Sequence, residues 1–402
     1  MTPSEHLLTE LQCLLDNLKQ TGGLTNNSSI NINEHPANNN DLTILLDQLL
    51  TEANIHLSNT WAAHMTPAVS ATSLLGQTIA GLHNGNLLSP QLYPILVQIE
   101  QKTISWLCQI FKQTNGHFVP SGSYANLDAL WQAKQANSTH SNIVYTSTAA
   151  HYSIAKACQI LDLELILIPC NEQGEISSEA LLKACEVTQP LAIVATLGTT
   201  ALGAIDPLSD CIAIAQRFNS WCHIDASWGG ALCILPEYDH LFADLAGANS
   251  VCIDPHKALS QPKPSSVLLY QHEINKIDAN VSYLEEKPLA HLPGSHGGEN
   301  FLPLWFMLVS KGTKVLKEQL RYRLSQAQLF AHALDQLEGC TVYPTRTGIV
   351  GFDITPEKTI DTLINRGVFS RVQISGKTIY RAVFMNNHVS AEALIAELQA
   401  YL

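Results

Sequence analysis

Four consecutive residues that follow a short apolar run could do chemistry together. Asp254, Pro255, His256 and Lys257 come directly after Ser250–Ile253, whose apolar residues predict a buried strand. An amine at a strand end, inside a cleft, can lose part of its hydration, which lowers its pKa and makes it a nucleophile toward a carbonyl, as in a Schiff-base lysine. The alternative is a solvated surface lysine, which is the commoner fate of a single lysine.

A second acid ends another apolar run. Asp225 precedes Lys257 by a separation that fits one β-α-β step, and Ala-Ser-Trp-Gly-Gly follows it. The Asp225 carboxylate could pair with a cationic ring nitrogen, or it could form an Asx turn that ends the strand. Gly229 and Gly230 would let the backbone pass close to a flat group or to a neighbouring strand.

Further polar residues stand where other predicted strands meet helices. In PSGSYANLDALWQAK, a Gly-Ser loop opens a helix, whose free N–H groups and dipole could hold a phosphate, with Gly122 and Ser123 at the cap. Serine before a helix is also an ordinary N-cap. His151 could stack on a planar ligand or could be structural, and Thr199 and Thr200 follow another strand.

These side chains together match the needs of one cofactor. For each residue taken singly, an ordinary structural role explains its presence at least as well as a chemical role does. Together they supply an amine for an aldehyde, an acid for a ring nitrogen, a flat partner for the ring and a cup for a phosphate. Pyridoxal phosphate has these parts and acts as an electron sink for carbanions. The sequence therefore predicts a pyridoxal phosphate site.

The elements that must position these residues follow from hydrophobic periodicity. From about residue 115 to 270, short apolar runs alternate with amphipathic stretches. This pattern is typical of a mostly parallel sheet with helices on both faces, in which ligands bind beyond the carboxyl ends of the strands. The predicted strands are 142–147, 163–169, 191–197, 222–226, 250–254 and 266–270.

The two ends of the chain have different patterns. Residues 21–41 are rich in Asn, Gly and Ser and predict a linker, and a helix over 41–57 follows behind Asp41. After Gly312, one long amphipathic helix ends at Gly339, and strands and helices alternate beyond it. We expect an N-terminal helical segment over 1–70, a large cofactor-binding domain over 71–310 and a small α+β domain over 311–402.

Composition excludes several classes of protein. With a net charge of −13 and only 22 Lys plus Arg in 402 residues, the chain lacks the basic face that a nucleic-acid partner needs. No stretch approaches the ~20 apolar residues of a membrane helix, and the N-terminus lacks the order of a signal peptide, so we expect a cytoplasmic protein. The ten cysteines form no CxxC pair, which favours buried thiols over disulfides or zinc.

From about Asn59 onward, the sequence resembles a known family. HIDASWGG and DPHK occur with SGSYANLDAL, AAHYS, ATLGTTALGAIDPL and PLWFMLVSKGT in that family's order and spacing. The resemblance is to pyridoxal phosphate-dependent amino-acid decarboxylases of the glutamate, cysteine-sulfinate and aromatic amino-acid type. It implies the aspartate aminotransferase-like fold (fold type I), with a mostly parallel seven-stranded sheet and a small C-terminal α+β domain. It also implies a homodimer with active sites at the subunit interface.

The resemblance implies three catalytic roles. Lys257 should form the Schiff base with the cofactor, Asp225 should pair with the pyridine nitrogen, and His151 should stack on the ring. Pro255 would then fix the turn, so that His256 and Lys257 address opposite ends of one cofactor.

The resemblance also places residues around the cofactor's phosphate and ring edge. Gly122, Ser123 and His256 should contact the phosphate, with Asp254 nearby. Thr200 should lie near the ring or near Asp225.

Substrate choice depends on two further positions. Residues 84–101 are more similar to the glutamate and cysteine-sulfinate members, and His64 falls where acidic-substrate members have a polar side chain. Arg381 matches an arginine that faces a substrate carboxylate in glutamate decarboxylases, and arginine suits a bidentate grip on a carboxylate. A salt bridge at a surface or interface explains Arg381 equally well. An acidic substrate, such as glutamate, aspartate or cysteine sulfinate, is favoured.

One segment departs from the family. The family has a mobile loop before the long helix, with a tyrosine thought to protonate the carbanion. Here the segment 283–305 is shorter than in the family. It has no tyrosine after Tyr283, and Tyr283 comes too early in the segment to fill that role. Residues 295–297 stand in place of the family's arginine. His291 or His296 could donate the proton. The departure leaves two alternatives open: aldehyde-forming or eliminating chemistry, or a non-catalytic descendant that binds a partner.

Overall fold

The structure is a computed structural model of the 402-residue chain, and it describes residues 39–136, 141–274, 276, 282, 290–355, 360–374 and 376–401. The chain divides into two units, Met1–Ser58 and Asn59–Leu402. In the first unit, helix α2 (Asn39–Ala53) and a short 3₁₀ helix, η1 (Asn54–Leu57), are described. The helix thus begins before its predicted cap at Asp41. The predicted linker lies outside the described residues up to position 38.

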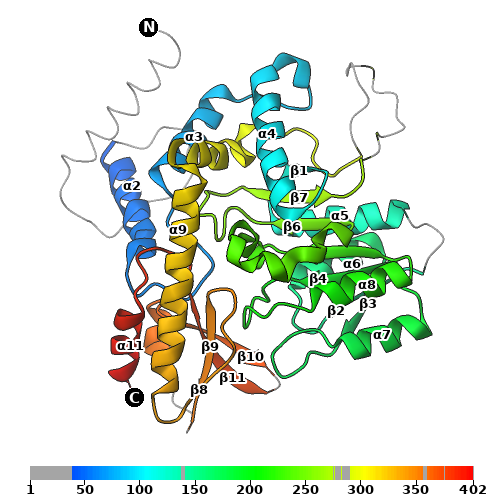
Figure 1. The fold of residues 1–402 in the computed structure, drawn as a ribbon. Coiled ribbons are helices and arrows are strands. Elements are labelled where there is room, and N and C mark those ends of the chain that lie inside the picture. Colours follow the sequence, from blue (N-terminus) through cyan, green and yellow to red (C-terminus); the bar gives the residue numbers. More distant parts are fainter. Residues whose placement is uncertain are drawn as a thin grey trace. The chain divides into compact units, whose positions relative to one another are not determined.

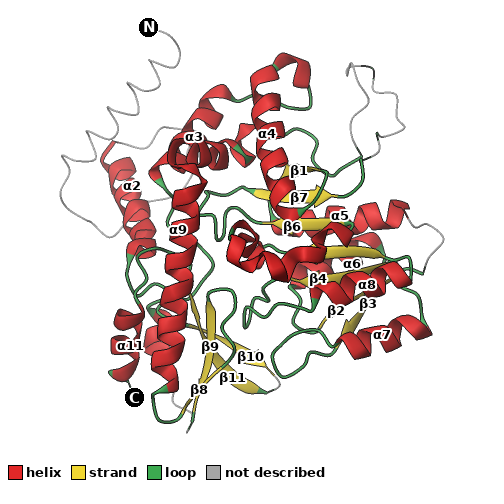
Figure 2. Cartoon of the chain, viewed as in Figure 1, coloured by secondary structure: helices red, strands yellow, loops and turns green. Residues whose placement is uncertain are grey.

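A seven-stranded sheet is the centre of the second unit (Figures 1 and 2). Its strand order is β1-β7-β6-β5-β4-β2-β3, and β7 alone runs in the direction opposite to the other six strands. The predicted fold class is therefore confirmed, and each predicted run contains a strand. The edge strand β1 had no prediction of its own. The strands are β1 (Asn115–Val119), β2 (Ile143–Ser147), β3 (Glu164–Ile168), β4 (Ala192–Thr196), β5 (Trp221–Asp225), β6 (Ser250–Ile253) and β7 (Ser266–Tyr270).

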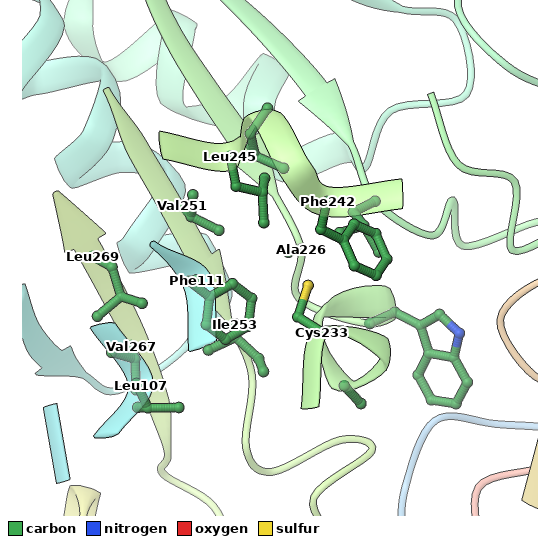
Figure 3. Packing of buried hydrophobic residues seen from close by; sticks show 14 of the residues in the cluster. Leu107, Phe111, Ala226, Cys233, Phe242, Leu245, Val251, Ile253, Val267 and Leu269 are labelled. Atoms are coloured by element: carbon green, nitrogen blue, oxygen red, sulfur yellow. The ribbon is translucent and has the colours of Figure 1, made fainter. Parts of the chain in front are cut away.

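Helices cover both faces of this sheet because strand side chains alternate between the two faces. On one face, Val251 and Ile253 share a core cluster with residues of α4, α7, α8 and the 3₁₀ segments η3 and η4. Figure 3 shows part of this cluster, which includes Phe111 of α4 and Ile253 of β6. On the other face, Cys252 packs with residues of α5 and α6. The covering elements are α4 (Pro94–Phe111), α5 (Gly122–Ala136), α6 (Tyr152–Leu161), α7 (Ser178–Val187), α8 (Leu208–Arg217), η3 (Gly229–Ile234) and η4 (Pro236–Gly247).

The connection from β5 to β6 consists of 3₁₀ turns instead of an α-helix. Gly229 is the first residue of η3, and its N–H donates to the Leu197 carbonyl at 2.9 Å. A Cβ atom on Gly229 would lie 2.5 Å from that carbonyl oxygen, so only glycine allows this approach. The sequence predicted that the glycine pair passes close to a flat group or to a neighbouring strand. Gly229 lies against the chain segment that directly follows the neighbouring strand β4.

The C-terminal part is a four-stranded antiparallel sheet, β10-β11-β9-β8, covered by helices. The long helix α9 (Leu302–Asp335) begins earlier than predicted, but it is broken at Gly312, where φ is 74°. It packs against α3 near one end and against α11 and β8 near the other (Figure 1). The predicted domain boundaries at residues 70 and 310 stay predictions. The elements are α3 (Ala71–His83), η2 (Pro90–Leu92), η5 (Gly298–Asn300), β8 (Cys340–Val342), β9 (Ile349–Ile354), α10 (Asp361–Asn365), β10 (Ser370–Ile374), β11 (Lys377–Val383) and α11 (Ala391–Gln399).

Two predictions from composition can be compared with the described residues. Across these residues, we find no helix with the length and apolar character needed to cross a membrane. The cysteines in the described part of the chain are free thiols, and most of them are buried, as the sequence predicted.

Candidate active site

A cavity of about 320 Å³ opens beyond the carboxyl ends of β4, β5 and β6, next to the first residues of α5 and α6. All of the residues predicted to bind the cofactor line this one cavity, although they come from five separate segments of the chain. These residues are Gly122, Ser123, His151, Thr200, Asp225, Asp254, His256 and Lys257.

The amine of Lys257 is paired with a carboxylate. Its Nζ atom lies 3.0 Å from Oδ2 of Asp254, whose Oδ1 accepts a hydrogen bond from the Ser266 hydroxyl. Burial lowers the pKa of Lys257, but the charges of Asp254 and Asp225 outweigh burial, and the net pKa is raised. The predicted fall in pKa was therefore wrong, because desolvation was considered without the neighbouring acids. Lys257 must pass a proton to another group before it can attack a carbonyl.

Asp225 is buried beneath the cavity and held at both carboxylate oxygens. Oδ1 accepts a hydrogen bond from the backbone N–H of Ser227 at 3.1 Å, and Oδ2 accepts one from the side-chain amide of Asn126 at 3.0 Å. Burial raises the pKa of Asp225, but the Lys257 charge and these hydrogen bonds outweigh it and leave the pKa lowered. Asp225 is therefore a carboxylate at neutral pH, which is the form that can pair with a protonated ring nitrogen.

A chain of hydrogen bonds behind Asp225 fixes how Asn126 is oriented. The amide nitrogen of Asn126 donates to Asp225, so its oxygen accepts, and Nε2 of His223 must carry the proton in their 2.9 Å contact. Nδ1 of His223 then accepts from the Ser250 hydroxyl, at 2.8 Å, and that hydroxyl accepts from the Trp221 indole N–H. Burial lowers the pKa of His223 to about 4, so this histidine is neutral at pH 7.

The sequence did not predict Asn126 and His223 as site residues. His223 stands two residues before Asp225 in a strand, so its side chain shares a face with Asp225. Asn126 follows Gly122 by about one helical turn, so it lies on the same side of α5 as the predicted phosphate cup. These two spacings were the available signals.

His151 caps helix α6 and lines the cavity. Its Nδ1 atom accepts a hydrogen bond from the backbone N–H of Ser153 at 3.3 Å and lies 2.8 Å from the Ser153 hydroxyl, which in turn accepts from Asn126. Because Nδ1 accepts, the proton of the neutral ring is on Nε2. Burial is the main cause that lowers the pKa of His151. A neutral ring in a fixed orientation suits stacking on a planar cofactor.

The first turn of α5 forms the predicted phosphate end of the cavity. The N–H groups of Tyr124 and Ala125 donate to the Ser121 carbonyl, whereas those of Gly122 and Ser123 have no acceptor among the residues that the structure describes. A Cβ atom on Gly122 would lie 2.8 Å from an oxygen of the Asp254 carboxylate, so a side chain there would displace Asp254.

Two further residues of the cavity lining, Lys263 and His256, are basic. Lys263, which the sequence analysis did not select, also lines the cavity. His256 donates from Nδ1 to the Ser265 carbonyl at 2.5 Å, and its Nε2 lies 3.6 Å from Asp254. Asp254 would repel a phosphate, so its contacts with Lys257 and Ser266 indicate that it acts on the lysine.

The cavity wall contains a polar group that a ligand could satisfy. Oγ1 of Thr196 is buried at the cavity, and no described residue forms a hydrogen bond with it. An unpaired buried hydroxyl is unusual in a folded protein. With the free N–H groups of α5, the Lys257 amine and the Asp225 carboxylate, the donor and acceptor set fits a phosphate, an aldehyde and a ring nitrogen. The residues present therefore fit pyridoxal phosphate.

The two predicted substrate residues do not line this cavity. The Arg381 guanidinium is buried, and it donates to the carbonyls of Thr200 and Ala63 and to the Ser370 hydroxyl. Burial lowers the pKa of Arg381. His64 is exposed near Arg381, and burial of part of its ring and the Arg381 charge lower its pKa. Arg381 thus lies directly behind Thr200 in the cavity wall.

The predicted proton donors also lie outside the cavity lining. His291 stacks on His117 with ring centroids 4.5 Å apart, and Nε2 of His296 lies 3.9 Å from Glu100. Burial lowers the pKa of His291 to about 4, so at neutral pH this ring is neutral and lacks the acidic proton of an imidazolium. Tyr283 and the residues up to 289 lie outside the described residues.

This fold and this site define a pyridoxal phosphate protein of fold type I. The family described as "Pyridoxal-dependent decarboxylase conserved domain" matches residues 27–354, and the chain belongs to this family. Its cofactor is therefore pyridoxal phosphate.

Individual relatives agree with this assignment. L-2,4-diaminobutyrate decarboxylase of Rhizobium meliloti (strain 1021) is 33% identical over 221 residues, which are 52% of this chain and 44% of that protein. The match thus spans less than half of this curated relative. Mouse CSAD superposes with a TM-score of 0.84 at 18% identity, over 100% of this chain and 99% of that chain. Rhodiola rosea 4-hydroxyphenylacetaldehyde synthase gives 0.84 at 18% identity, over 100% and 98%. These two structures show the fold alone.

Proposed function

We propose that this chain removes the α-carboxyl group of a small L-amino acid as CO2, with pyridoxal phosphate as its cofactor. The observation that carries the proposal is that the amine of Lys257 and the carboxylate of Asp225 reach one cavity, in a chain of the pyridoxal-dependent decarboxylase family. When bound, the cofactor supplies an electron sink for the pair that is released at the substrate Cα.

Each residue of the site has a role in this proposal. Once its amine has lost a proton, Lys257 would hold the aldehyde end of the cofactor, with the aldehyde oxygen leaving as water, and Asp254 positions this amine at 3.0 Å. Asp225 holds a positive charge at the ring nitrogen, and His151 packs against the ring. The first turn of α5, with Gly122 and Ser123, together with His256, holds the phosphate.

For the substrate, we propose L-2,4-diaminobutyrate as the first candidate. The curated relative of that name supports it, because it is 33% identical over half of this chain. Arg381, the predicted anchor of an acidic substrate, already donates to Thr200, Ala63 and Ser370 and so gives little support to an acidic substrate. Glutamate, aspartate and cysteine sulfinate remain the second group to test.

The test is CO2 release from the purified protein with added pyridoxal phosphate, over a panel of L-amino acids. We expect stoichiometric CO2 and amine from one short polar amino acid, and none from the Lys257→Ala variant. Preference for glutamate or cysteine sulfinate would overturn the first substrate candidate alone. Bound cofactor with no CO2 from any amino acid would overturn the decarboxylase proposal and favour the non-catalytic alternative.

A second candidate function is oxidative formation of an aldehyde. The sequence has no tyrosine from residue 284 to 305, where the family's proton-donating residue would lie, and one structure of the same fold is named an aldehyde synthase. This reaction would consume O2 and release ammonia and hydrogen peroxide with each CO2. Oxygen uptake and peroxide, measured in the same incubations, would distinguish the two functions.

We also propose a homodimer with active sites at the subunit interface, on the resemblance to the family. Sedimentation equilibrium of the protein with its cofactor should give twice the chain mass. A monomer that releases CO2 at full rate would contradict this assembly.

A further inference from the structure

Arg323 is a buried cation on α9 that has no carboxylate partner in the described part of the chain. Its side chain is 3% exposed, and no acidic oxygen among these residues lies within salt-bridge distance. Burial lowers the pKa of Arg323 to about 10, so the guanidinium keeps its charge at neutral pH. A buried charge without a partner is unfavourable, and proteins usually pair such a group or neutralise it with an ion.

The hydrogen bonds of Arg323 leave one nitrogen unused. Nε donates to the Gln319 carbonyl at 3.3 Å, and Nη1 donates to the carbonyls of Ala258 at 2.9 Å and Met385 at 2.8 Å. Nη2, with its two N–H groups, is buried and has no hydrogen-bond partner among the residues that the structure describes. The guanidinium therefore has an unsatisfied end as well as an unbalanced charge.

A small cavity lies beside this guanidinium. It has a volume of about 20 Å³, and of the described residues that line it, Arg323 alone is ionisable. That volume exceeds the roughly 10–15 Å³ that one water molecule needs. The other walls include Leu320, Leu324 and Phe384, which offer no hydrogen-bond acceptor.

The remaining polar side chains of the wall are already engaged. The indole N–H of Trp228 donates to the carbonyl and to the hydroxyl of Thr347, at 3.0 and 3.1 Å. The Thr347 hydroxyl donates to the Gly203 carbonyl at 2.9 Å. Only Nη2 of Arg323 is left to bind whatever fills the space.

We propose that this cavity holds one small monovalent inorganic anion, of the chloride class, against Nη2 of Arg323. A water molecule would satisfy the N–H groups but would leave the positive charge unbalanced inside an apolar wall. A volume of about 20 Å³, close to what one water molecule needs, favours an ion near water in size over sulfate, phosphate or an organic carboxylate. A monatomic anion meets both the charge and the size.

The anion would act close to the active site. Nη1 of Arg323 binds the carbonyl of Ala258, the residue after Lys257, and also the carbonyl of Met385 in the C-terminal part. Trp228 lines both this cavity and the active-site cavity. Occupancy should therefore change the environment of Lys257, a step that rests on the proposed function.

The direct test is a crystal of the cofactor-loaded protein grown with sodium bromide in place of chloride. We expect an anomalous bromide peak beside Nη2 of Arg323, and no peak there in an Arg323→Gln variant. Ordered water at this position, with no bromide at high bromide concentration, would overturn the proposal. This result does not depend on activity, so it is separate from the test of the decarboxylase.

A solution measurement keeps the proposal testable if Arg323→Gln does not fold. At constant ionic strength, replacing gluconate by chloride should raise the melting temperature of the native protein along a saturable curve. The matched control is Arg321→Gln, which removes an exposed arginine of the same helix, α9, that pairs with Glu237 of η4, and this variant should keep the curve. A melting temperature that stays constant, or changes only linearly, as chloride replaces gluconate would contradict the site. A visible cofactor spectrum that stays unchanged by chloride would remove only the coupling to Lys257.

Discussion

The Lys257→Ala variant is expected to lose both the visible absorption band of the bound cofactor and the release of CO2. The band depends on a covalent link that only an amine at the aldehyde can form, and Nζ of Lys257 lies in the cavity at 3.0 Å from Asp254. We expect CO2 release to fall by roughly 10³-fold or more, the range seen when a catalytic nucleophile is removed. The visible absorption spectrum would measure the loss of the band, and a CO2 assay would measure the fall in activity.

Lys263 provides the matched comparison, because it is the other lysine that lines the cavity. The Lys263→Ala variant should keep the absorption band, and a weaker affinity for the cofactor would not contradict this expectation. Reduction with borohydride, followed by peptide mass mapping, identifies the lysine that carries the cofactor. Cofactor attached to Lys263, or a band that persists in Lys257→Ala, would show that the assignment of Lys257 is wrong.

The Asp225→Asn variant is expected to lower kcat by roughly 10²- to 10³-fold, as other losses of preorganised charge do. Asparagine has nearly the shape of aspartate and can still accept the hydrogen bond of Ser227, but it cannot hold a positive charge at the ring nitrogen. The carboxylate is ionised in the native protein, since its pKa is lowered, so the substitution removes a full charge. Steady-state kinetics would measure kcat, and nitrogen-15 NMR of labelled cofactor would report whether the ring nitrogen stays protonated.

Graded variants separate the charge of Asp225 from its orientation. His223→Gln retains a donor toward Asn126, whereas His223→Leu removes it, so the leucine variant should show the larger change in the cofactor spectrum. Asn126→Leu removes the contact with Asp225 itself and should lower kcat further. Thermal unfolding of each variant would identify simple loss of fold. Full kcat in Asp225→Asn, with bound cofactor, would refute the role of the acid.

The sequence was sufficient to predict most of the sheet and the cavity lining. Polar residues after apolar runs must gather when the runs are parallel strands, because their carboxyl ends meet at one edge, and Asp225 and Lys257 do so. Strands β1 and β10 were missed, since NGHFV and SRVQI contain Gly, His, Arg or Gln, which weaken the apolar signal. Both strands are recognised only through the strands with which they pair.

Partnerships that depend on tertiary placement could not be predicted. Neither the bond from Asn126 to Asp225 nor the ion pair of Lys257 with Asp254 follows from spacing alone, because each needs the position of a helix or turn over the sheet. The same ion pair reversed the expected shift in the pKa of Lys257. Arg381 was selected by its residue type, and only the structure gives its bonds to Thr200 and Ala63.

Helix α5 sets a length scale for whatever the cavity contains. Gly122 lies in its first turn, where N–H groups are free, and Asn126, four residues later, donates a hydrogen bond to Asp225. The two positions are separated by about 6 Å of helix rise. Helix α5 therefore holds the spacing of these two positions constant. Inserting a single residue between them would rotate Asn126 by about 100° around the helix axis and remove its hydrogen bond to Asp225.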